Sequence, residues 1–230
     1  MKGFWLALLL ISTICLGGCG TEQIKSDNFE WSYLKTGNCV IVTKSLDYES
    51  TYIEIPENID GKPVKVIGDN AFYQHTNAIS ISLPETLTEI QGSAFYRCYA
   101  LKSINIPKNV ERIDDQAFFR CSSLENIFVD NANTYFADID GVLYSKDIIE
   151  LIAYPEGKSD KSFTVPASVR KINPGFGHYP HLKILIIPET VTEMPDYNMF
   201  VYPDDITLVV KESSVAEEYA IRYNLKYELM

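Results

Sequence analysis

The sequence has little positive charge. Lysine and arginine number 20 against 31 aspartates and glutamates, which gives a formal net charge of −11. Nucleic-acid binding needs lysine and arginine to neutralise phosphates, so this balance argues against DNA and RNA as partners. It argues equally against attachment to an anionic membrane through a basic patch. The acidity otherwise serves solubility.

Residues that carry catalysis or bind metals are also scarce. Of three histidines, His178 and His181 are separated by Pro180, with no acidic or cysteine ligand fixed nearby in the sequence. The sequence contains no H-E-x-x-H, no G-x-S-x-G and no glycine-rich phosphate loop. No acid and base residues are paired at a shared repeat position. We therefore expect no enzyme, no metal site and no cofactor.

The one marked hydrophobic run lies at the N-terminus. Phe4 to Leu16 is apolar over about a dozen residues, too short to cross a bilayer comfortably and typical of a signal-peptide core. Leu16-Gly17-Gly18-Cys19 resembles the bacterial lipobox, in which a peptidase cleaves before the cysteine and its sulfur receives a diacylglyceryl group. The alternative is an ordinary signal peptide followed by a chance cysteine.

These features predict the course of the first thirty residues. We expect a lipoprotein signal peptide at 1–18, lipidation of Cys19 and a polar tether at 19–30. The protein would then be extracytoplasmic and attached to the bacterial membrane through its lipid rather than through a transmembrane helix.

Residues 66–129 contain three consecutive segments that repeat with a period of 23. A fixed period between 20 and 29 residues indicates a solenoid, because each unit can bury its apolar face only against its neighbours. The clearest matching positions are Ile67, Ile90 and Ile113, then Ala71-Phe72, Ala94-Phe95 and Ala117-Phe118, and then Ile81, Ile104 and Ile127.

The repeat has a recognisable consensus. Leu101 to Asn109 fits the leucine-rich repeat pattern L-x-x-L-x-L-x-x-N, and the units read I-x-x-x-A-F-x-x-C-x-x-L-x-x-I-x-I-P-x-x-V. This resembles the BspA-type (bacterial surface) leucine-rich repeat family over about residues 33 to 230. Asp60–Val64 and Asp140–Tyr144 resemble that family's habitual inserts. The resemblance implies surface display and a role in adhesion or host interaction, with a ligand that varies.

The predicted fold is a β-rich leucine-rich repeat solenoid with about seven stacked parallel strands and short helical turns. It occupies residues 31–230 as a single domain. Its parts are an N-terminal β-hairpin cap and first strand at 31–64, regular repeats at 65–129, a hairpin insertion at 130–161, irregular repeats at 162–210, and a C-terminal cap with a short helix at 211–230.

Two cysteines share one repeat position. Cys98 and Cys121 lie on adjacent coils, which are about 5 Å apart, so a disulfide is within geometric reach. The alternative is a column of small buried thiols that act as spacers. We favour thiols, because His75 holds the same position in the preceding unit and the position therefore does not require sulfur.

Two further groups have two interpretations each. Tyr73, Tyr96 and Phe119 follow the three Ala-Phe pairs and either pack on one another or grip a sugar or peptide. An oxygen-rich cluster in the insertion could bind calcium, although its spacing is not that of an EF-hand and Asp-Gly is ordinary in turns. The cluster consists of Asp130, Asn133, Asp138 and Asp140.

Outward positions of the strands form the predicted binding face, since alternation directs the aliphatic residues inward. Phe128, Ile184 and Ile186 would give it a contiguous apolar part, which indicates contact unless the insertion or a neighbouring molecule covers them. The predicted face comprises Ser80, Ser82, Lys102, Ser103, Asn105, Glu125, Asn126, Phe128, Thr164, Ile184 and Ile186.

The predicted function is that of a lipid-anchored surface or envelope protein that binds a protein or glycan through this face. A solenoid supplies a long rigid surface that needs little ordering on binding. One alternative is an envelope scaffold that organises partners within the producing cell. An enzyme acting on glycans or peptides ranks last.

Overall fold

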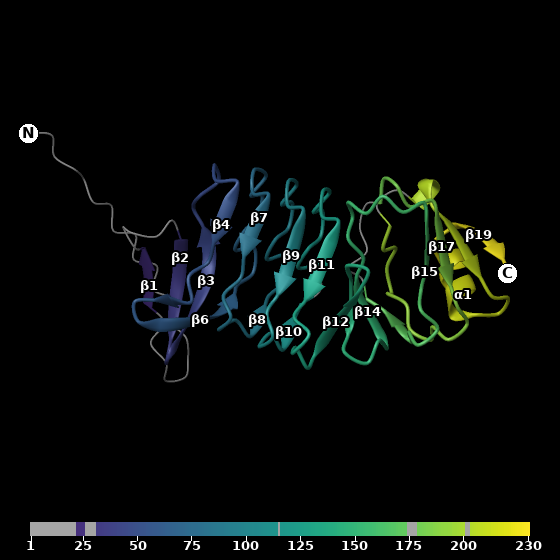
Figure 1. Ribbon diagram of the computed structural model, residues 1–230. Helices are drawn as coiled ribbons and strands as arrows, with labels where there is room; N and C mark the ends of the chain where they lie inside the picture. Colours follow the sequence, from purple (N-terminus) through teal and green to yellow (C-terminus); the bar gives the residue numbers. More distant parts are fainter. Residues whose placement is uncertain (1–21, 26–30, 115, 174–178, 201–202) are drawn as a thin grey trace, which may run out of the picture.

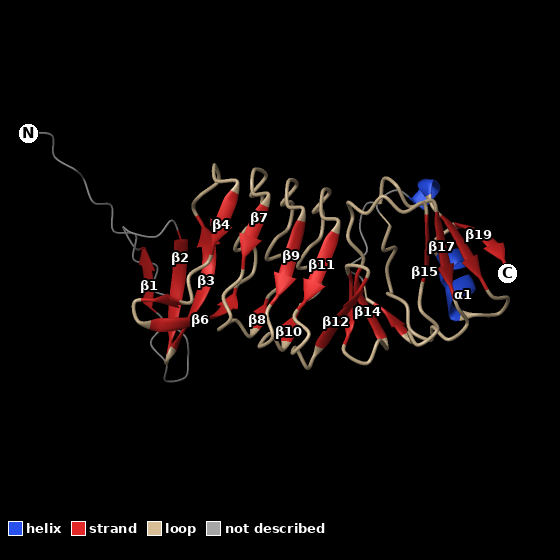
Figure 2. Ribbon diagram, in the orientation of Figure 1, coloured by secondary structure: helices blue, strands red, loops and turns tan. Residues whose placement is uncertain are grey.

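A computed structural model of the chain describes residues 22–25, 31–114, 116–173, 179–200 and 203–230. The molecule is an elongated solenoid in which short strands run across the long axis, and the described part contains one α-helix (Figures 1 and 2). The predicted signal peptide at 1–18 and Cys19 lie outside the described residues.

The first half of the strand face is a four-stranded parallel sheet. Ile53 pairs with Ile81, and Ile104 pairs with Ile127, so the inward isoleucines form the vertical column that the 23-residue period predicts. The strands, in spatial order, are β4 (Tyr52–Glu54), β7 (Ser80–Ser82), β9 (Ser103–Ile106) and β11 (Asn126–Val129).

A second sheet forms the opposite wall of the same coils. Ile67 pairs with Ile90, and Ile90 pairs with Ile113, which again follows the period. The sheet contains β6 (Lys62–Ile67), β8 (Glu89–Ile90) and β10 (Arg112–Ile113), with the two-residue strand β5 (Asn58–Ile59) paired to β6.

The N-terminal hairpin continues this second sheet. β2 (Trp31–Thr36) and β3 (Cys39–Ser45) pair antiparallel, and β3 pairs parallel with β6. The structure differs from the predicted tether, because β1 (Glu22–Lys25) pairs antiparallel with β2. Without β1, one side of β2 would be an unpaired edge, so even a polar segment is recruited as a strand.

The Ala-Phe segments form short turns with the hydrogen-bond spacing of a 3₁₀ helix, one of the forms that the sequence allows, and they do not extend into helices. Successive bonds join residues three apart, such as Tyr73 N–H to the Asn70 carbonyl and His75 N–H to the Phe72 carbonyl. Asn70 and Gln74 have positive φ, at 56° and 60°, and the residues 23 and 46 positions later repeat these values within a few degrees. Two left-handed residues in each turn stop a helix from propagating.

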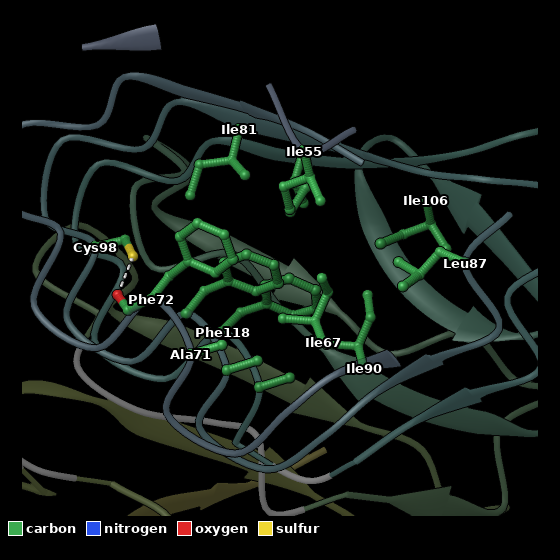
Figure 3. Packing of buried hydrophobic residues seen from close by; sticks show 14 of the residues in the cluster. Ile55, Ile67, Ala71, Phe72, Ile81, Leu87, Ile90, Cys98, Ile106 and Phe118 are labelled. Carbon is green, nitrogen blue, oxygen red and sulfur yellow. Dashed lines mark hydrogen bonds between the residues drawn. The ribbon is translucent and has the colours of Figure 1, made fainter. Parts of the chain in front are cut away.

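Identical side chains stack inside the coils (Figure 3). The Phe72 and Phe95 rings are 5.3 Å apart, and the Phe95 and Phe118 rings are 5.6 Å apart. Cys98 and Cys121 are free thiols, and each donates to the carbonyl of the preceding coil's phenylalanine, at 3.2 and 3.1 Å. The thiol column that we favoured is therefore the arrangement in the structure.

The insertion is a three-stranded meander, in which β13 and β14 form the predicted hairpin and β12 is an additional strand before it. β12 (Phe136–Ile139), β13 (Val142–Ser145) and β14 (Glu150–Ala153) pair antiparallel in sequence order. Leu143 packs in the first core and Tyr144 in the second, so β13 is buried on both faces. Strands buried on both faces carry continuous apolar runs instead of alternating ones, as Val142-Leu143-Tyr144 does.

The tip of the meander ends the first strand sheet. Along the outer edge of β11, Ile127 N–H donates to the Gly141 carbonyl at 2.9 Å and Val129 N–H donates to Asp138 Oδ1 at 2.8 Å. These bonds replace those that a fifth strand would make. The predicted continuous face is thus divided after β11.

A second four-stranded parallel sheet continues the strand face beyond the meander, which makes eight face strands instead of seven. The last strand is the final extended piece of the chain, paired parallel with its predecessor. This sheet contains β15 (Ser162–Thr164), β17 (Ile184–Ile187), β18 (Thr207–Val210) and β19 (Lys226–Leu229), while β16 (Lys171–Ile172) pairs with β14 on the opposite wall.

The single described α-helix connects the last two strands. α1 (Val215–Arg222) follows the 3₁₀ turn η1 (Pro203–Asp205) and β18, and it buries Ala216, Tyr219 and Ala220. The Ser214 hydroxyl accepts from Glu217 N–H, as the capping box predicts. The Glu217 carboxylate accepts from Ser213 N–H.

The Asp140-Gly141 turn predicts a large effect of one methyl group. Gly141 has φ +75°, and an added Cβ would lie 2.3 Å from Asn126 Oδ1 and 3.0 Å from Asn126 Cα. Gly61 has nearly the same φ, +74°, and open space around it. Gly61→Ala should cost about 1–2 kcal/mol from backbone strain. Gly141→Ala should cost about 2 kcal/mol more from the clash, measured by chemical denaturation. Equal losses would show that the turn does not press on β11.

His75 occupies the cysteine position at the start of the column. Its ring is 1% exposed and stacks on Tyr48 at 4.4 Å, and neither ring nitrogen makes a hydrogen bond of normal geometry within the described structure. Burial lowers the pKa of His75, while the nearby backbone of Phe72 and Tyr73 partly opposes the shift. The imidazole is therefore neutral in the folded protein near pH 7.

A lowered pKa makes the fold acid-sensitive at His75. The unfolded chain takes up a proton at this histidine as the pH falls through about 6.5, before the folded state does, so the free energy of unfolding decreases below that pH. His75→Cys, which places the next coils' own residue here, should flatten the pH dependence of unfolding between pH 7 and 5. His181→Asn changes an exposed histidine and is the control. A profile unchanged by His75→Cys contradicts the assignment.

Candidate functional site

A groove of about 460 Å³ lies on the strand face across β7, β9 and β11. It runs over the ends of these strands and the turns that follow them. The lining residues are Ser80, Ile81, Ser82, Leu83, Glu85, Ser103, Asn105, Ile106, Pro107, Phe128, Val129 and Asp130.

The groove brings together five residues of the predicted face. Pairing places Ser80 beside Ser103 and Asn105 beside Phe128 on neighbouring strands, with Ser82 on the far side of Asn105. Among described residues, none of the four polar side chains has a hydrogen-bond partner within the protein. Phe128 is 45% exposed. The floor therefore presents free hydroxyl and amide groups beside one exposed ring.

Three predicted residues on the first sheet lie beside the groove. Lys102 and Glu125 form an exposed ion pair, with Nζ and Oε1 3.8 Å apart. Such a pair contributes little to stability because solvent screens it. Asn126 lies against the Gly141 turn, where an added glycine Cβ would touch its side chain.

The remaining predicted residues lie elsewhere. Thr164 is on β15, and Ile184 and Ile186 are on β17, in the sheet beyond the meander. The structure therefore does not join them with Phe128 into one apolar surface on a single sheet. The meander does not cover Phe128 either, since its side chain remains exposed.

Sequence reasoning missed four residues at or near the groove. Tyr52 and Glu54 flank Ile53 on β4 and belong to the same rows as Ser80 and Ser82. Their alternation about Ile53 was a usable signal, and Tyr52 is 73% exposed. Glu85 and Asp130 line the groove from the turns after β7 and β11. Asp130 stands where the two preceding units have proline, so the broken consensus marked it.

The groove is acidic at its rim and uncharged on its floor. Glu85 and Asp130 are its only charged lining residues, and no lysine or arginine is among them. Lys108 Nζ lies 4.0 Å from Glu85 Oε2, at the limit of an ion pair and well exposed. An anionic group in the groove would therefore meet two carboxylates, of which only Glu85 has a lysine near it.

The aromatic ladder on the return limb packs on itself. The Tyr73 and Tyr96 rings are 5.5 Å apart and tilted by 10°, and the Tyr96 and Phe119 rings are 5.8 Å apart and tilted by 19°. The Arg97 guanidinium lies 5.1 Å from the Tyr96 ring centre. Stacking occupies the ring faces that a sugar would need. In the structure the three rings therefore pack on one another, as the first of the two interpretations states.

The oxygen-rich cluster in the insertion serves the backbone. Buried Asn133 donates to the carbonyls of Pro107 and Val110 and accepts from the N–H groups of Tyr135 and Phe136. Asp130 and Asp138 also accept backbone N–H bonds. Within the described chain, no three histidine, cysteine or acidic side chains are grouped to hold a metal ion.

Only one of the two neighbouring histidines lies in the described part of the chain. His178 lies outside the described residues, and His181 is exposed. No helix in the described part of the chain is long and apolar enough to cross a membrane.

Comparison with known families identifies the repeat. A model of the BspA type leucine rich repeat region matches six copies over residues 46–156, the part that holds the groove. Residues 46–156 are therefore similar to the BspA-type leucine-rich repeat family. Proteins of this family are bacterial, commonly surface-associated and involved in binding. The resemblance that the sequence predicts over about residues 33 to 230 is confirmed for residues 46–156.

The similar solved structures are distant in sequence. A leucine-rich repeat protein of T. pallidum is 17% identical, covers 90% of this chain and 98% of its own, and superposes with a TM-score of 0.49. One from Eubacterium ventriosum is 17% identical, with coverage of 86% and 73% and a TM-score of 0.43. The pneumococcal vaccine antigen PcpA is 14% identical, with coverage of 91% and 98% and a TM-score of 0.41. No curated protein matches the sequence.

Proposed function

We propose that this BspA-type protein is a lipid-anchored binding protein of the bacterial surface or envelope, which recognises another macromolecule through its strand face. The groove across β7, β9 and β11 carries the proposal, because it gathers unpaired polar groups and an exposed aromatic ring on a concave surface. The family's common association with surfaces and binding supports the same conclusion.

Rigidity of the floor favours tight recognition. β7 and β9 pair with strands on both sides, so their backbone is fixed before any ligand arrives. Short side chains such as Ser80, Ser103 and Asn105 lose little rotational freedom when they bind. Little of the interaction energy would therefore be lost to the entropic cost of ordering these side chains, and most of it would contribute to affinity.

Attachment through Cys19 can be tested by removing its sulfur. Cys19→Ala should release the protein from the membrane fraction of the producing cells and abolish incorporation of labelled fatty acid, because no thioether can form. Cys39→Ala changes a cysteine within the folded domain and is the control. Protease treatment of intact cells should cut the wild-type domain if it is displayed. Protection would favour a scaffold within the envelope.

Recognition through the groove can be separated from recognition by the rest of the strand face. Phe128→Asp should reduce capture of the partner at least about tenfold, because it adds a charge at the exposed end of the groove. Ile184→Asp changes an equally exposed residue on β17 and should leave capture unchanged. Both variants should unfold within about 0.5 kcal/mol of wild type, measured by denaturation. The proposal that the groove is the binding site would be contradicted if both variants lost capture equally. It would also be contradicted if Phe128→Asp lost none.

A further inference from the structure

We propose that the groove binds a linear, uncharged glycan, with a sugar ring against Phe128 and sugar hydroxyls on the serine and asparagine floor. This rests on the proposed function and names the ligand class of the same site. The chemistry of the lining residues, their spacing and their charge each lead to this ligand class.

The floor matches the hydrogen-bonding character of a sugar. Ser80, Ser82 and Ser103 each offer a hydroxyl that donates and accepts, and Asn105 offers both functions through its amide. A sugar hydroxyl also donates and accepts, so it can pair with any of them. An apolar ligand would cover these groups without pairing them, which costs binding energy.

Phe128 supplies the apolar part. The C–H groups on one side of a pyranose ring form a flat apolar surface that packs against an aromatic face. Phe128 is exposed at the β11 end of the groove. In the other direction, Tyr52 on β4 lies in the same row as Ser80 and Ser103 and is the most exposed of the strand-face aromatics. Polar floor residues thus lie between two exposed rings.

The spacing suits a polymer. Ser82, Asn105 and Phe128 occupy equivalent positions on consecutive strands, and neighbouring strands are about 4.8 Å apart. One pyranose unit of an extended glycan has about this length. Successive sugars can therefore lie over successive strands, and each meets an equivalent position of the repeat.

Charge selects uncharged sugars. Glu85 and Asp130 line the groove, and no lysine or arginine does. A carboxylate accepts hydrogen bonds from neighbouring sugar hydroxyls, whereas it repels uronate, sulfate and phosphate groups. An acidic glycan should therefore bind more weakly than a neutral one of the same length.

An extended peptide is the competing ligand. Peptides that add a strand to a sheet need an unpaired edge. The groove lies on the face of β7 and β9, whose edges are already paired, so strand addition is excluded there. A peptide could use only its side chains, which makes the repeated hydroxyl floor a poor match.

The test uses the full chain and measures binding by titration calorimetry and ligand-observed NMR. The neutral probes are hexasaccharides of glucose, N-acetylglucosamine, mannose and galactose. Hexagalacturonate is the charged probe, and a hexapeptide of alternating serine and tyrosine is the peptide probe. At least one neutral hexasaccharide should bind with a Kd of about a millimolar or tighter, and hexagalacturonate should bind at least about tenfold more weakly.

Variants locate the site. Phe128→Ala should weaken the neutral glycan about tenfold, and Asn105→Ala should weaken it several-fold. Ile184→Ala, on the other sheet, should have no effect. The inference is overturned if no neutral hexasaccharide binds at about 10 mM, if hexagalacturonate or the peptide binds better, or if Phe128→Ala binds like wild type.

These outcomes distinguish the two proposals. Failure of every glycan, together with a partner whose capture still requires Phe128, removes the ligand class and leaves the groove as a binding site. Glycan binding that survives Phe128→Ala, with capture also unaffected by Phe128→Asp, removes both.

Discussion

Stacking of each coil on its neighbours is the constraint from which the rest of this molecule follows. A coil of 23 residues is too small to enclose a core, so its isoleucines, phenylalanine and cysteine are buried only when the next coil supplies the matching residues. Backbone hydrogen bonds also join neighbouring coils. Even the turns are linked in this way, since Phe72 N–H donates to the Ala94 carbonyl of the next coil. The column of identical contacts fixes the register along the chain.

Fixed register gathers the outward residues on one surface. Ile81, Ile104 and Ile127 define the inward row. The residues next to each of them on the same strand must therefore point outward and line one surface at regular intervals. The core therefore tolerates almost any small polar outward residue, and the groove's chemistry is free to vary without loss of the fold. The acidic rim and the serine floor belong to this variable layer.

The sequence predicts the regular half well, because period, alternation and burial agree there. Ile67, Ile90 and Ile113 align as their spacing requires. In the insertion the sequence predicts the hairpin of β13 and β14 but not β12, and the apolar run Val142–Tyr144 is compatible with a strand that has one buried face or two. Only the position of Leu143 and Tyr144 in different cores decides between them.

The site shows the same limit. Five of the groove residues follow from alternation alone, as Ser80 and Ser103 do. Glu85 and Asp130 lie in the turns that follow β7 and β11. The alternation of inward and outward residues applies to strands and does not predict the direction of a side chain in a turn. Ile184 and Ile186 lie on the strand face as predicted, but the break after β11 removes them from the first sheet, and the bonds that Ile127 and Val129 donate to the meander tip make that break.

The meander also separates the two halves structurally. Gly141 and Asp138 bond to the backbone of β11, so a whole 23-residue unit inserted before β11 would leave this junction and the coils beyond it in place. Each added unit would lengthen the recognition surface by one strand width. The length of the strand face could thus be adjusted by duplication or deletion of single repeats, while the C-terminal half stays unchanged.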